Sequence, residues 1–247
     1  MRAMLSRAVL SYETMGHMPA ASIRARVRAQ MIDEIKSIAR QHLATDGANL
    51  SLRAVARDLG VVSSAIYRYF ASRDDLLTAL ILDAYNALGA AVEAADAAVD
   101  ADDLTGRWLA VSHAVRDWAV AVPHEYALIY GSPVPGYKAP QDTVAAATRS
   151  VTVLGRILQH GAEQGRLRGV ADDDPELPPP VAETVALISA SICPDVPPRV
   201  LARGLGVWVQ LFGTVSFELF GQFQTVVHDR AAFFDHQMRA QARYLGI

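Results

Sequence analysis

The segment from Ser51 to Leu77 constrains the fold of this chain more than any other part of it. It holds two short apolar repeats at helical spacing, separated only by the tetrapeptide Leu-Gly-Val-Val. The first repeat has one apolar face, made of Leu52, Val55, Ala56 and Leu59. Ser51 can cap this repeat, and Gly60 suits the sharp reversal after it, where a side chain would be strained. The segment therefore predicts two short helices joined by a tight turn, the helix-turn-helix arrangement.

The second short helix is expected to have seven residues, Ser63 to Tyr69, with Ser63 as its cap. Ile66 and Phe70 lie four residues apart and face the core. The side chains that fall away from that core are those of Ser63, Ser64, Tyr67 and Arg68. Such a helix can enter a major groove, where short hydroxyls meet base edges and a phenol meets phosphate. The alternative is an ordinary surface helix whose tyrosines are half buried against their neighbours.

Helical periodicity also dominates the rest of the chain, and no strand-like alternation is convincing. A long first helix precedes the turn at Gly47, and Ser72 with Asp75 resembles a capping box that opens a long fourth helix. Further helices are expected over residues 103–122, 124–130, 141–164, 181–192, 198–222 and 229–245. The acidic, proline-rich stretch 165–180 is expected to be a disordered insertion. The fold class is therefore predicted to be all-α.

Charge is divided unevenly between the two ends of the chain. Residues 1–79 hold 11 Lys or Arg against 7 Asp or Glu, a net charge of +4. The remaining 12 basic and 19 acidic residues give the rest of the chain a net charge of −7. A basic head on an acidic body indicates that only the head meets a polyanion. We expect a flexible tail over residues 1–21, a DNA-binding domain over 22–80 and a larger body over 81–247.

The stretch LSLRAVARDLGVVSSAIYRYFASRDDLL, which begins at Leu50, closely resembles the DNA-binding signature of the TetR family of bacterial repressors. The shared pattern is a capped helix, Ala-x-x-x-Gly-Val, a short helix ending in Tyr-x-Tyr-Phe, and then Arg and Leu. Tyr69 stands where histidine is frequent in the family. The resemblance implies a three-helix DNA-binding domain followed by a helical domain for ligand binding and dimerisation. It also implies a homodimer that leaves a palindromic operator when a small molecule enters the body.

Carried over position by position, the resemblance points to a set of DNA contacts in the head. They are Ser51, Arg53, Ser63, Ser64, Tyr67, Arg68, Tyr69 and Arg73. Arg53 matches a base-reading position on the preceding helix. Arg73 matches a phosphate-binding position at the start of the fourth helix, where free N–H groups also favour a phosphate. Three arginines at the start of the first helix, Arg24, Arg26 and Arg28, are expected either to add backbone contacts or to form a solvated face.

Segment 198–222 of the body has a broad apolar face that several glycines interrupt. Glycine costs roughly 1 kcal/mol in a helix relative to alanine, so it is sensible where backbones approach closely or a ligand fills the space. Together with the last helix, this segment is the candidate four-helix dimer interface. The predicted interface residues are Leu201, Leu205, Trp208, Leu211, Val215, Leu219, Phe234 and Met238. The alternative is a helix face buried within one subunit.

A largely hydrophobic ligand pocket is expected among the aromatic side chains of the body. The candidates are Trp108, His113, Trp118, Tyr126, Tyr130, Tyr137, Phe212 and Phe217. Taken singly, each of these side chains is more consistent with an ordinary place in the core than with a ligand contact.

The sequence favours no catalytic function. It lacks a Gly-x-Ser-x-Gly elbow, a Walker loop, a Rossmann glycine fingerprint and a His-Glu-x-x-His pair. We therefore expect no enzyme activity, no cofactor and no metal, and we read the acidic run 172–176 as a solvated loop. No apolar run approaches the length of a membrane span, and the single cysteine, Cys193, fits a reducing cytoplasm.

The leading interpretation is a ligand-responsive transcriptional repressor in the cytoplasm. Its expected partners are double-stranded operator DNA, a small hydrophobic effector and a second copy of the chain. One alternative is a small-molecule-binding or scavenging protein whose head has no regulatory role. The other is an enzyme built on a helical bundle.

Overall fold

The computed structural model describes residues 20–47, 50–167 and 176–247, and these residues form α-helices and no strand. The helices are α2 Ala20–Asp46, α3 Leu52–Asp58, α4 Ser63–Ile66, α5 Arg73–Ala97, α6 Leu104–Ala121, α7 Pro123–Tyr130, α8 Thr143–Ala147, α9 Arg149–Glu163, α10 Pro179–Ile192, α11 Pro198–Leu219 and α12 Arg230–Leu245. The predicted all-α fold class is confirmed. Residues 1–19 of the expected tail and 168–175 of the expected insertion lie outside the described residues.

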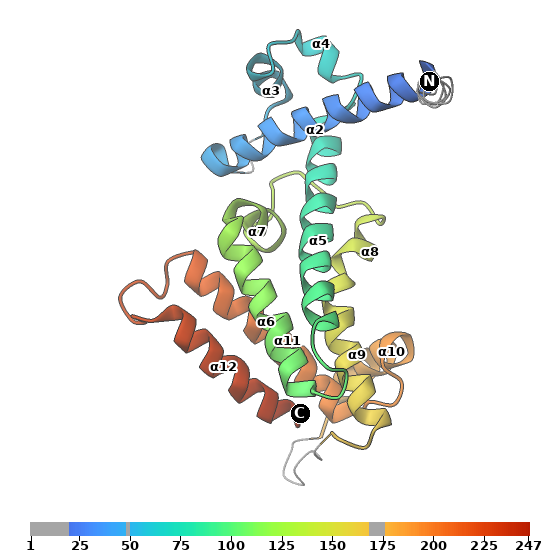
Figure 1. Ribbon diagram of the computed structural model, residues 1–247, viewed down its shortest axis with the longest axis vertical. Helices are drawn as coiled ribbons and strands as arrows, with labels where there is room; N and C mark the ends of the chain where they lie inside the picture. The colour runs from blue at the N-terminus through green and yellow to red at the C-terminus, as the bar shows by residue number, and fades with distance from the viewer. Residues whose placement is uncertain (1–19, 48–49, 168–175) are drawn as a thin grey trace, which may run out of the picture.

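The head consists of α2, α3, α4 and the first turns of α5, gathered at one end of the molecule (Figure 1). Its core includes Ile35, Ala39, Leu52, Val55, Ile66, Phe70, Leu76 and Leu77. Ser51 caps α3 as predicted, because its hydroxyl accepts a hydrogen bond from the Ala54 N–H at 3.5 Å. Gly60 has a φ of 73°, a left-handed conformation that lets the chain reverse between α3 and α4. Figure 1 shows that α3 and α4 lie at the end of the head that is remote from the body.

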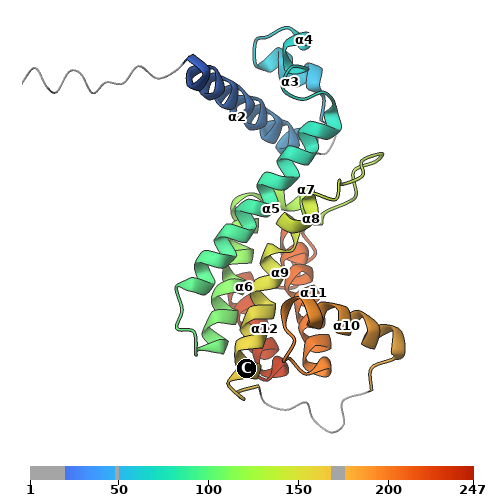
Figure 2. The ribbon, with the colours of Figure 1, turned by 90° about the vertical axis from the view of Figure 1, so that its right-hand side faces the viewer.

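Helix α5 joins the head to the body. Ser72 caps it by accepting a hydrogen bond from the Asp75 N–H at 3.0 Å, as the serine half of the predicted capping box requires. Its first turns bury Leu76 and Leu77 in the head, and its later turns bury Leu88 in the separate core of the body. Both views show α5 running from one part into the other (Figures 1 and 2). A shift of α5 within the body therefore moves the head as well.

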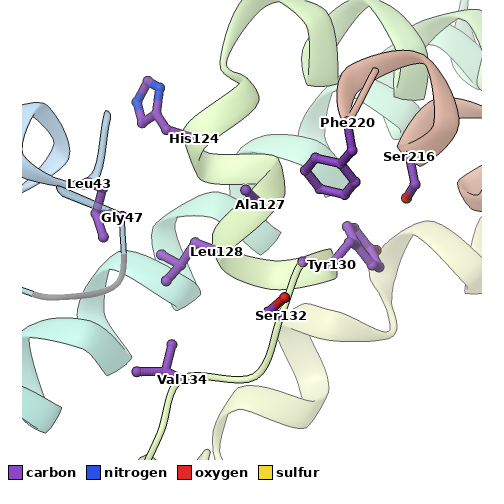
Figure 3. Close-up of a pocket in the computed structure, with 11 residues that line it drawn as sticks. Leu43, Gly47, His124, Ala127, Leu128, Tyr130, Ser132, Val134, Ser216 and Phe220 are labelled. Atoms are coloured by element: carbon purple, nitrogen blue, oxygen red, sulfur yellow. The ribbon is translucent and has the colours of Figure 1, made fainter. Parts of the chain in front are cut away.

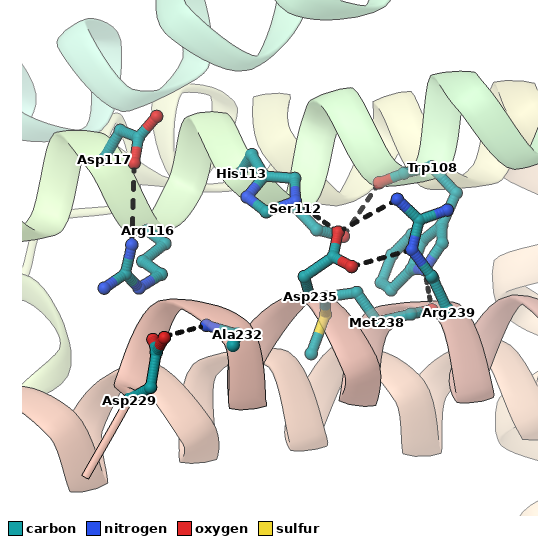
Figure 4. A network of polar contacts seen from close by, with 10 residues as sticks. All are labelled: Trp108, Ser112, His113, Arg116, Asp117, Asp229, Ala232, Asp235, Met238 and Arg239. Carbon is teal, nitrogen blue, oxygen red and sulfur yellow. Dashed lines mark hydrogen bonds and ion pairs between the residues drawn. The ribbon is translucent and has the colours of Figure 1, made fainter.

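The body packs α6 to α12 around the second half of α5. The indole of Trp108 on α6 is wholly buried and donates to the Met238 carbonyl on α12 at 2.8 Å. Arg116 and Glu218 form a two-pronged pair that joins α6 to α11, with contacts of 2.8 and 2.6 Å. Asp235 on α12 accepts from Arg239 at 2.7 Å and pairs with His113 on α6 at 3.1 Å (Figure 4). The contacts that Trp108, Arg116 and His113 of α6 make with α11 and α12 fix the last two helices against the centre of the body.

Helices α5 and α11 are long and apolar enough to cross a membrane by length and composition, contrary to the expectation from the sequence. The core helix of a soluble protein meets the same criteria. Both helices bury apolar side chains in the described cores, and α5 also carries Asp74, Asp83 and Glu93. Packing in these cores therefore accounts for the buried part of the apolar character of both helices.

Three expectations about the helices are corrected by the structure. Helix α4 ends at Ile66, and Tyr69 continues it only as a tight turn, with its N–H bonded to the Ile66 carbonyl at 2.8 Å. The cap position of α4 is Val62, so Ser63 is its first residue and does not cap it. The single helix expected over 141–164 is divided at Thr148, whose hydroxyl bonds to the Val144 carbonyl at 3.0 Å. Such a bond from a threonine back to the preceding turn often bends a helix.

Candidate nucleic-acid interface and junction cavity

The outer surface of the head carries most of the residues predicted to contact DNA. Helix α3 presents Arg53, and α4 presents Ser63 and Ser64, all of them exposed. Tyr67 follows directly and is 48% exposed, although it is a large aromatic residue. Ile66 between them is buried and anchors this short segment to the core of the head. A segment with one buried anchor and an outward row of hydroxyl groups can enter a groove without unfolding the head.

Tyr69 and Arg68 are positioned by the first helix of the head. The guanidinium carbon of Arg28 lies 5.1 Å from the centre of the Tyr69 ring. The same guanidinium donates a hydrogen bond to the Arg68 carbonyl at 3.2 Å. Tyr69 is only partly exposed, and Arg28 is engaged with the end of α4 as well as being exposed to solvent. This pairing indicates that Arg28 holds the end of α4 in place, a role that the sequence did not suggest.

Arg73, the predicted phosphate contact, is also tied to the backbone of the head. Its Nε donates to the Leu50 carbonyl at 3.1 Å, and its terminal nitrogen lies 3.5 Å from an Asp74 oxygen. About a third of the side chain, 34%, is exposed. Arg73 therefore joins the start of α5 to the segment that precedes α3, and a phosphate would be an additional partner.

The sequence reading missed two exposed side chains on the same surface. Val62, directly before α4, is 72% exposed, an unusual setting for a β-branched apolar residue. The side chain of Arg57 on α3 is 75% exposed while its Nε lies 3.2 Å from Asp58. A signal was available for Val62, because it falls outside the spacing of Ile66 and Phe70 and so cannot share their buried face.

Helices α2 and α3 are joined by a short contact between His42 and Asp58. The imidazole Nε2 lies 2.7 Å from a carboxylate oxygen. Hydrogen bonds from His42 and from Arg57 lower the pKa of the Asp58 carboxyl below its usual range. The contact fixes α3, and hence Arg53, against the long helix of the head.

The structure brings three of the residues predicted to bind a ligand together, since the rings of Tyr126, Tyr130 and Phe212 pack on one another, and it scatters the other five. Trp108 and Tyr126 are wholly buried, and each donates to a backbone carbonyl of the body, so both serve the core. His113 pairs with Asp235 (Figure 4), and Phe217 is 52% exposed. The remaining candidates divide between the head and the body: Trp118, Tyr130 and Phe212 pack against the body core, and Tyr137 against the head core.

A cavity of about 560 Å³ lies instead at the junction of head and body. Its lining residues come from the end of α2, from α7 and the loop after it, and from the end of α11: Leu43, Gly47, His124, Ala127, Leu128, Tyr130, Gly131, Ser132, Val134, Ser216 and Phe220. Tyr130 is the predicted ligand residue among them. Leu43 and Gly47 of the head lie across this space from Tyr130 and Phe220 of the body (Figure 3). The junction cavity is therefore walled by both parts of the molecule.

The aromatic wall of the junction cavity is closely packed and carries no charge. The Tyr130 ring packs on Phe212 with centroids 4.2 Å apart and on Tyr126 at 5.2 Å. Burial raises the pKa of Tyr130 above its usual range and that of Tyr126 to about 12. The Tyr126 hydroxyl donates to the Phe212 carbonyl at 3.0 Å and lies 2.8 Å from the Ser216 hydroxyl. Both phenols are consequently neutral at physiological pH.

A cluster of ion pairs crosses the junction beside the cavity. Asp83 on α5 accepts from Lys36 at 2.9 Å and from Arg40 at 2.7 Å, both of which lie on α2. Arg40 also lies 3.1 Å from Glu125 on α7. The three elements that meet at the junction are thus connected by charge as well as by apolar contact.

The predicted dimer residues require a correction. Five of them are buried within the chain itself: Leu201, Leu211, Val215, Phe234 and Met238. For these five the alternative reading holds, a helix face that packs inside one subunit, because they belong to the core of the body. Leu205, Trp208 and Leu219 are partly buried against the same core.

The opposite face of α11 is the one that solvent reaches. Val209 is 68% exposed and Phe217 is 52% exposed, and Gly206 and Gly213 share their side of the helix. A Cβ built at Gly204 would lie 3.1 Å from Leu158, so that glycine allows close packing within the chain. At Gly206 and Gly213 a Cβ would meet no heavy atom within 4 Å among the described residues. Packing inside the described part of the chain therefore does not explain these two glycines.

Comparison with known proteins covers both parts of the chain. Residues 37–80 match the family model described as bacterial regulatory proteins, tetR family, and residues 108–241 match the tetracyclin repressor-like C-terminal domain. The HTH-type transcriptional regulator Rv1816 of Mycobacterium tuberculosis is 40% identical over 219 residues, which cover 87% of this chain and 92% of that protein. The HTH-type transcriptional regulator Mb1846 of Mycobacterium bovis matches to the same extent.

Solved structures agree with these relatives. Regulatory protein SCO4313 is 33% identical with a TM-score of 0.69, and the match covers 88% of this chain and 97% of that one. The TetR-family regulator PfmR from Thermus thermophilus is 19% identical with a TM-score of 0.56, over 86% of this chain and 96% of that one. The likeness to PfmR shows a shared fold only.

Proposed function

Because this chain belongs to the TetR family of bacterial regulators and is a DNA-binding transcriptional regulator, not an enzyme, we propose that it represses transcription as a ligand-responsive homodimer. It binds a palindromic operator through residues 22–80. Residues 81–247 bind a small, largely hydrophobic effector and form the dimer. Effector binding releases the operator.

The exposed outer surface of the head is the single observation that carries this proposal. Arg53, Ser63, Ser64 and Tyr67 lie together there on α3 and α4 and are exposed. In the dimer, each α4 with the turn after it enters a major groove, and the two half-sites lie about 34–36 Å apart. The net charge of +4 on residues 1–79 attracts the DNA, and the net charge of −7 on the rest keeps the body away from it.

The dimer forms through the exposed face of α11, with α12 beside it. Gly206 and Gly213 allow a second backbone to approach closely, and Val209 and Phe217 supply apolar area on the same face. The proposed interface thus lies on the same two helices that the sequence analysis expected, but it uses the exposed residues of α11 in place of the buried ones. Two copies of each helix make a four-helix arrangement of closed two-fold symmetry.

The test is DNA binding by the full-length protein and by two variants of Tyr67. DNA sites are selected from a random pool with the wild-type protein and compared with the intergenic DNA upstream of its own gene. The wild type should bind in a saturable, salt-sensitive way. Tyr67→Ala should bind at least tenfold more weakly, with Tyr67→Phe in between, and sedimentation should show the same oligomer for all three.

Absence of saturable, salt-sensitive binding by the wild type would overturn the repressor proposal. If such a protein still bound a small molecule, the scavenging alternative would be favoured.

A further inference from the structure

We infer that the loop between α7 and α8, residues 131–142, is a working part of the DNA-binding head, which keeps its structure only while this docking loop is packed on it. Val134 and Tyr137 are the positioning residues of the docking loop. The docking stands on contacts within the chain, and the effect on DNA rests on the proposed function. The DNA-binding unit then does not end at residue 80, because a segment of the body completes it.

The apolar side chains of the docking loop extend the core of the head. Val134 and Tyr137 are partly buried and pack against that core, together with Leu128 of α7. All three residues lie in the body by sequence. A domain of about 60 residues buries too little of its own surface to be more than marginally stable. A head made of residues 20–80 is therefore stabilised by the apolar area that the docking loop covers.

A tight turn brings the two positioning residues together. Residues 134–137 read Val-Pro-Gly-Tyr, which is the pattern of a type II turn, with proline second and a left-handed glycine third. Gly136 has a φ of 78°, and the Tyr137 N–H donates to the Val134 carbonyl at 3.1 Å. The residues at the two ends of such a turn lie close together, so Val134 and Tyr137 can pack on the same core.

A contact between two hydroxyl groups directs the docking loop to the start of α5. The Tyr137 hydroxyl lies 2.9 Å from that of Thr78. Thr78 directly follows Leu77, which is wholly buried in the core of the head. In Figure 1 the segment from α7 to α8 passes α5 just below α2. The docking loop therefore holds the first turns of α5, which Arg73 joins to the segment before α3 through the Leu50 carbonyl.

The helix before the docking loop is tied to the head by a separate contact. Glu125 of α7 lies 3.1 Å from Arg40 of α2, and the Glu125 side chain is only 14% exposed. The docking loop thus begins next to an element that is already fixed against the head. Its prolines, at positions 133, 135 and 140, also reduce the conformational freedom that docking removes.

Hydrogen exchange of the full-length protein tests the docking. Peptides from α3 and the start of α5 report on the head, and peptides from α9 report on the body. In Tyr137→Ala the head amides should exchange at least tenfold faster than in the wild type, while α9 keeps its wild-type rate. Tyr137→Phe should lie in between, since it keeps the ring and loses the contact with Thr78. Wild-type rates in the head of Tyr137→Ala, or an equal acceleration in α9, would overturn the inference.

Thr78→Val tests the same contact from its other side. It should raise the exchange rate of the head by the same factor as Tyr137→Phe. The double variant should exchange no faster than either single variant, because all three lack the same contact. Factors that multiply in the double variant would show that the two hydroxyls act separately, which would overturn the role given to this contact.

Gly136→Ala tests the turn without removing a side chain. An alanine Cβ here would meet no heavy atom within 4 Å among the described residues, so the strain comes from the left-handed φ. Exchange in the head should rise at least threefold. Gly165→Ala is the matched control, because Gly165 has a φ of 61° and equally open space at its Cβ but follows α9. A rise in head exchange that is equal in both variants, or found in neither, would overturn the inference.

DNA binding tests the consequence for the head. Tyr137→Ala should bind the selected DNA at least threefold more weakly. Its affinity should fall with salt along the wild-type slope, since Tyr137 acts on the head and not on a phosphate. Unchanged affinity in a variant whose head exchanges faster would overturn the link to DNA. No DNA binding by the wild type would overturn the proposed function and leave the docking to the exchange result.

Discussion

Arg28 of the first helix lies over the ring of Tyr69, with its guanidinium carbon 5.1 Å from the ring centre, and it donates to the neighbouring Arg68 carbonyl at 3.2 Å. The two residues are 41 positions apart in the sequence. This contact fixes the end of the segment that carries Ser63, Ser64 and Tyr67. The arrangement of the reading surface thus depends on a residue that belongs to a different helix.

Replacement of Arg28 should weaken operator binding because the segment with Ser63, Ser64 and Tyr67 is no longer held in place, and not because a positive charge is lost. A cation–π contact and a hydrogen bond of this kind contribute about 1–2 kcal/mol together, so Arg28→Ala should lower DNA affinity roughly fivefold to thirtyfold. Because the contact is internal, the slope of affinity against salt concentration should stay that of the wild type. The measurement is a DNA titration at several salt concentrations.

Arg26→Ala is the matched control for Arg28→Ala, since Arg26 is exposed on the same helix. A slope that falls by about one in Arg28→Ala would mean that Arg28 contacts phosphate directly, which contradicts the positioning role.

Val62 should read a thymine methyl group. It is 72% exposed beside the start of α4, and the methyl of thymine is the apolar feature of the major groove. Burial of a methyl group contributes about 0.8 kcal/mol, so deoxyuridine in place of thymidine at one position of the selected site should weaken binding about fourfold. Val62→Ser should remove that difference.

Val61→Ser is not a suitable control for Val62, because Val61 packs against the core of the head. The control is deoxyuridine in place of thymidine at positions outside the selected site, which should not change the affinity. If every thymidine of the site tolerates deoxyuridine in the wild type, Val62 does not read a base.

Gly206→Leu should stabilise the helix and yet weaken the dimer. A side chain at this position meets no heavy atom within 4 Å among the described residues, and leucine favours a helix over glycine by roughly 0.5–1 kcal/mol. The leucine would, however, hold two backbones apart at the proposed interface. Sedimentation equilibrium should show a dimer dissociation constant raised at least tenfold.

Ala190→Leu is the comparison for Gly206→Leu, since Ala190 is exposed on α10, a helix that is not part of the proposed interface. An unchanged dissociation constant for Gly206→Leu, with a folded dimer, would show that this face of α11 is not the interface.

Tyr126 should make stability depend on alkaline pH. Its pKa is raised by burial from the ordinary value of 10.0 to about 12, so the neutral phenol is the form that folding favours. The corresponding stability is fully present below pH 10.0 and is lost as the pH rises through about 12. Chemical unfolding across that range should show a fall in the free energy of unfolding. That fall should be smaller in Tyr126→Phe.

At neutral pH the same Tyr126→Phe variant should lose about 1–2 kcal/mol, because the hydroxyl bonds to the Phe212 carbonyl and to Ser216. Ser216→Ala is the control, since it removes one partner and leaves the phenol in place. An alkaline profile of Tyr126→Phe that matches the wild type would assign the pH dependence to other groups.

Local pattern was sufficient for most of the fold. The helical spacing around Ile66 and Phe70, the caps at Ser51 and Ser72 and the left-handed turn at Gly60 are all decided by neighbours in the sequence, and the structure has each of them. The end of α4 at Ile66 was not predictable in this way. The last residues of a short helix depend on what holds them, and here Arg28 from another helix does so.

The sequence by itself determined the helical class, the helix-turn-helix and the kind of surface that the head presents, because these depend on spacings of a few residues. Tertiary structure alone decided which face of α11 is buried, since Leu211 and Val209 are equally apolar in the sequence and lie 0% and 68% exposed. It also decided where the junction cavity lies, between Leu43 of the head and Phe220 of the body. A cavity forms where helices distant in sequence fail to fill the space between them, and no local pattern records that gap.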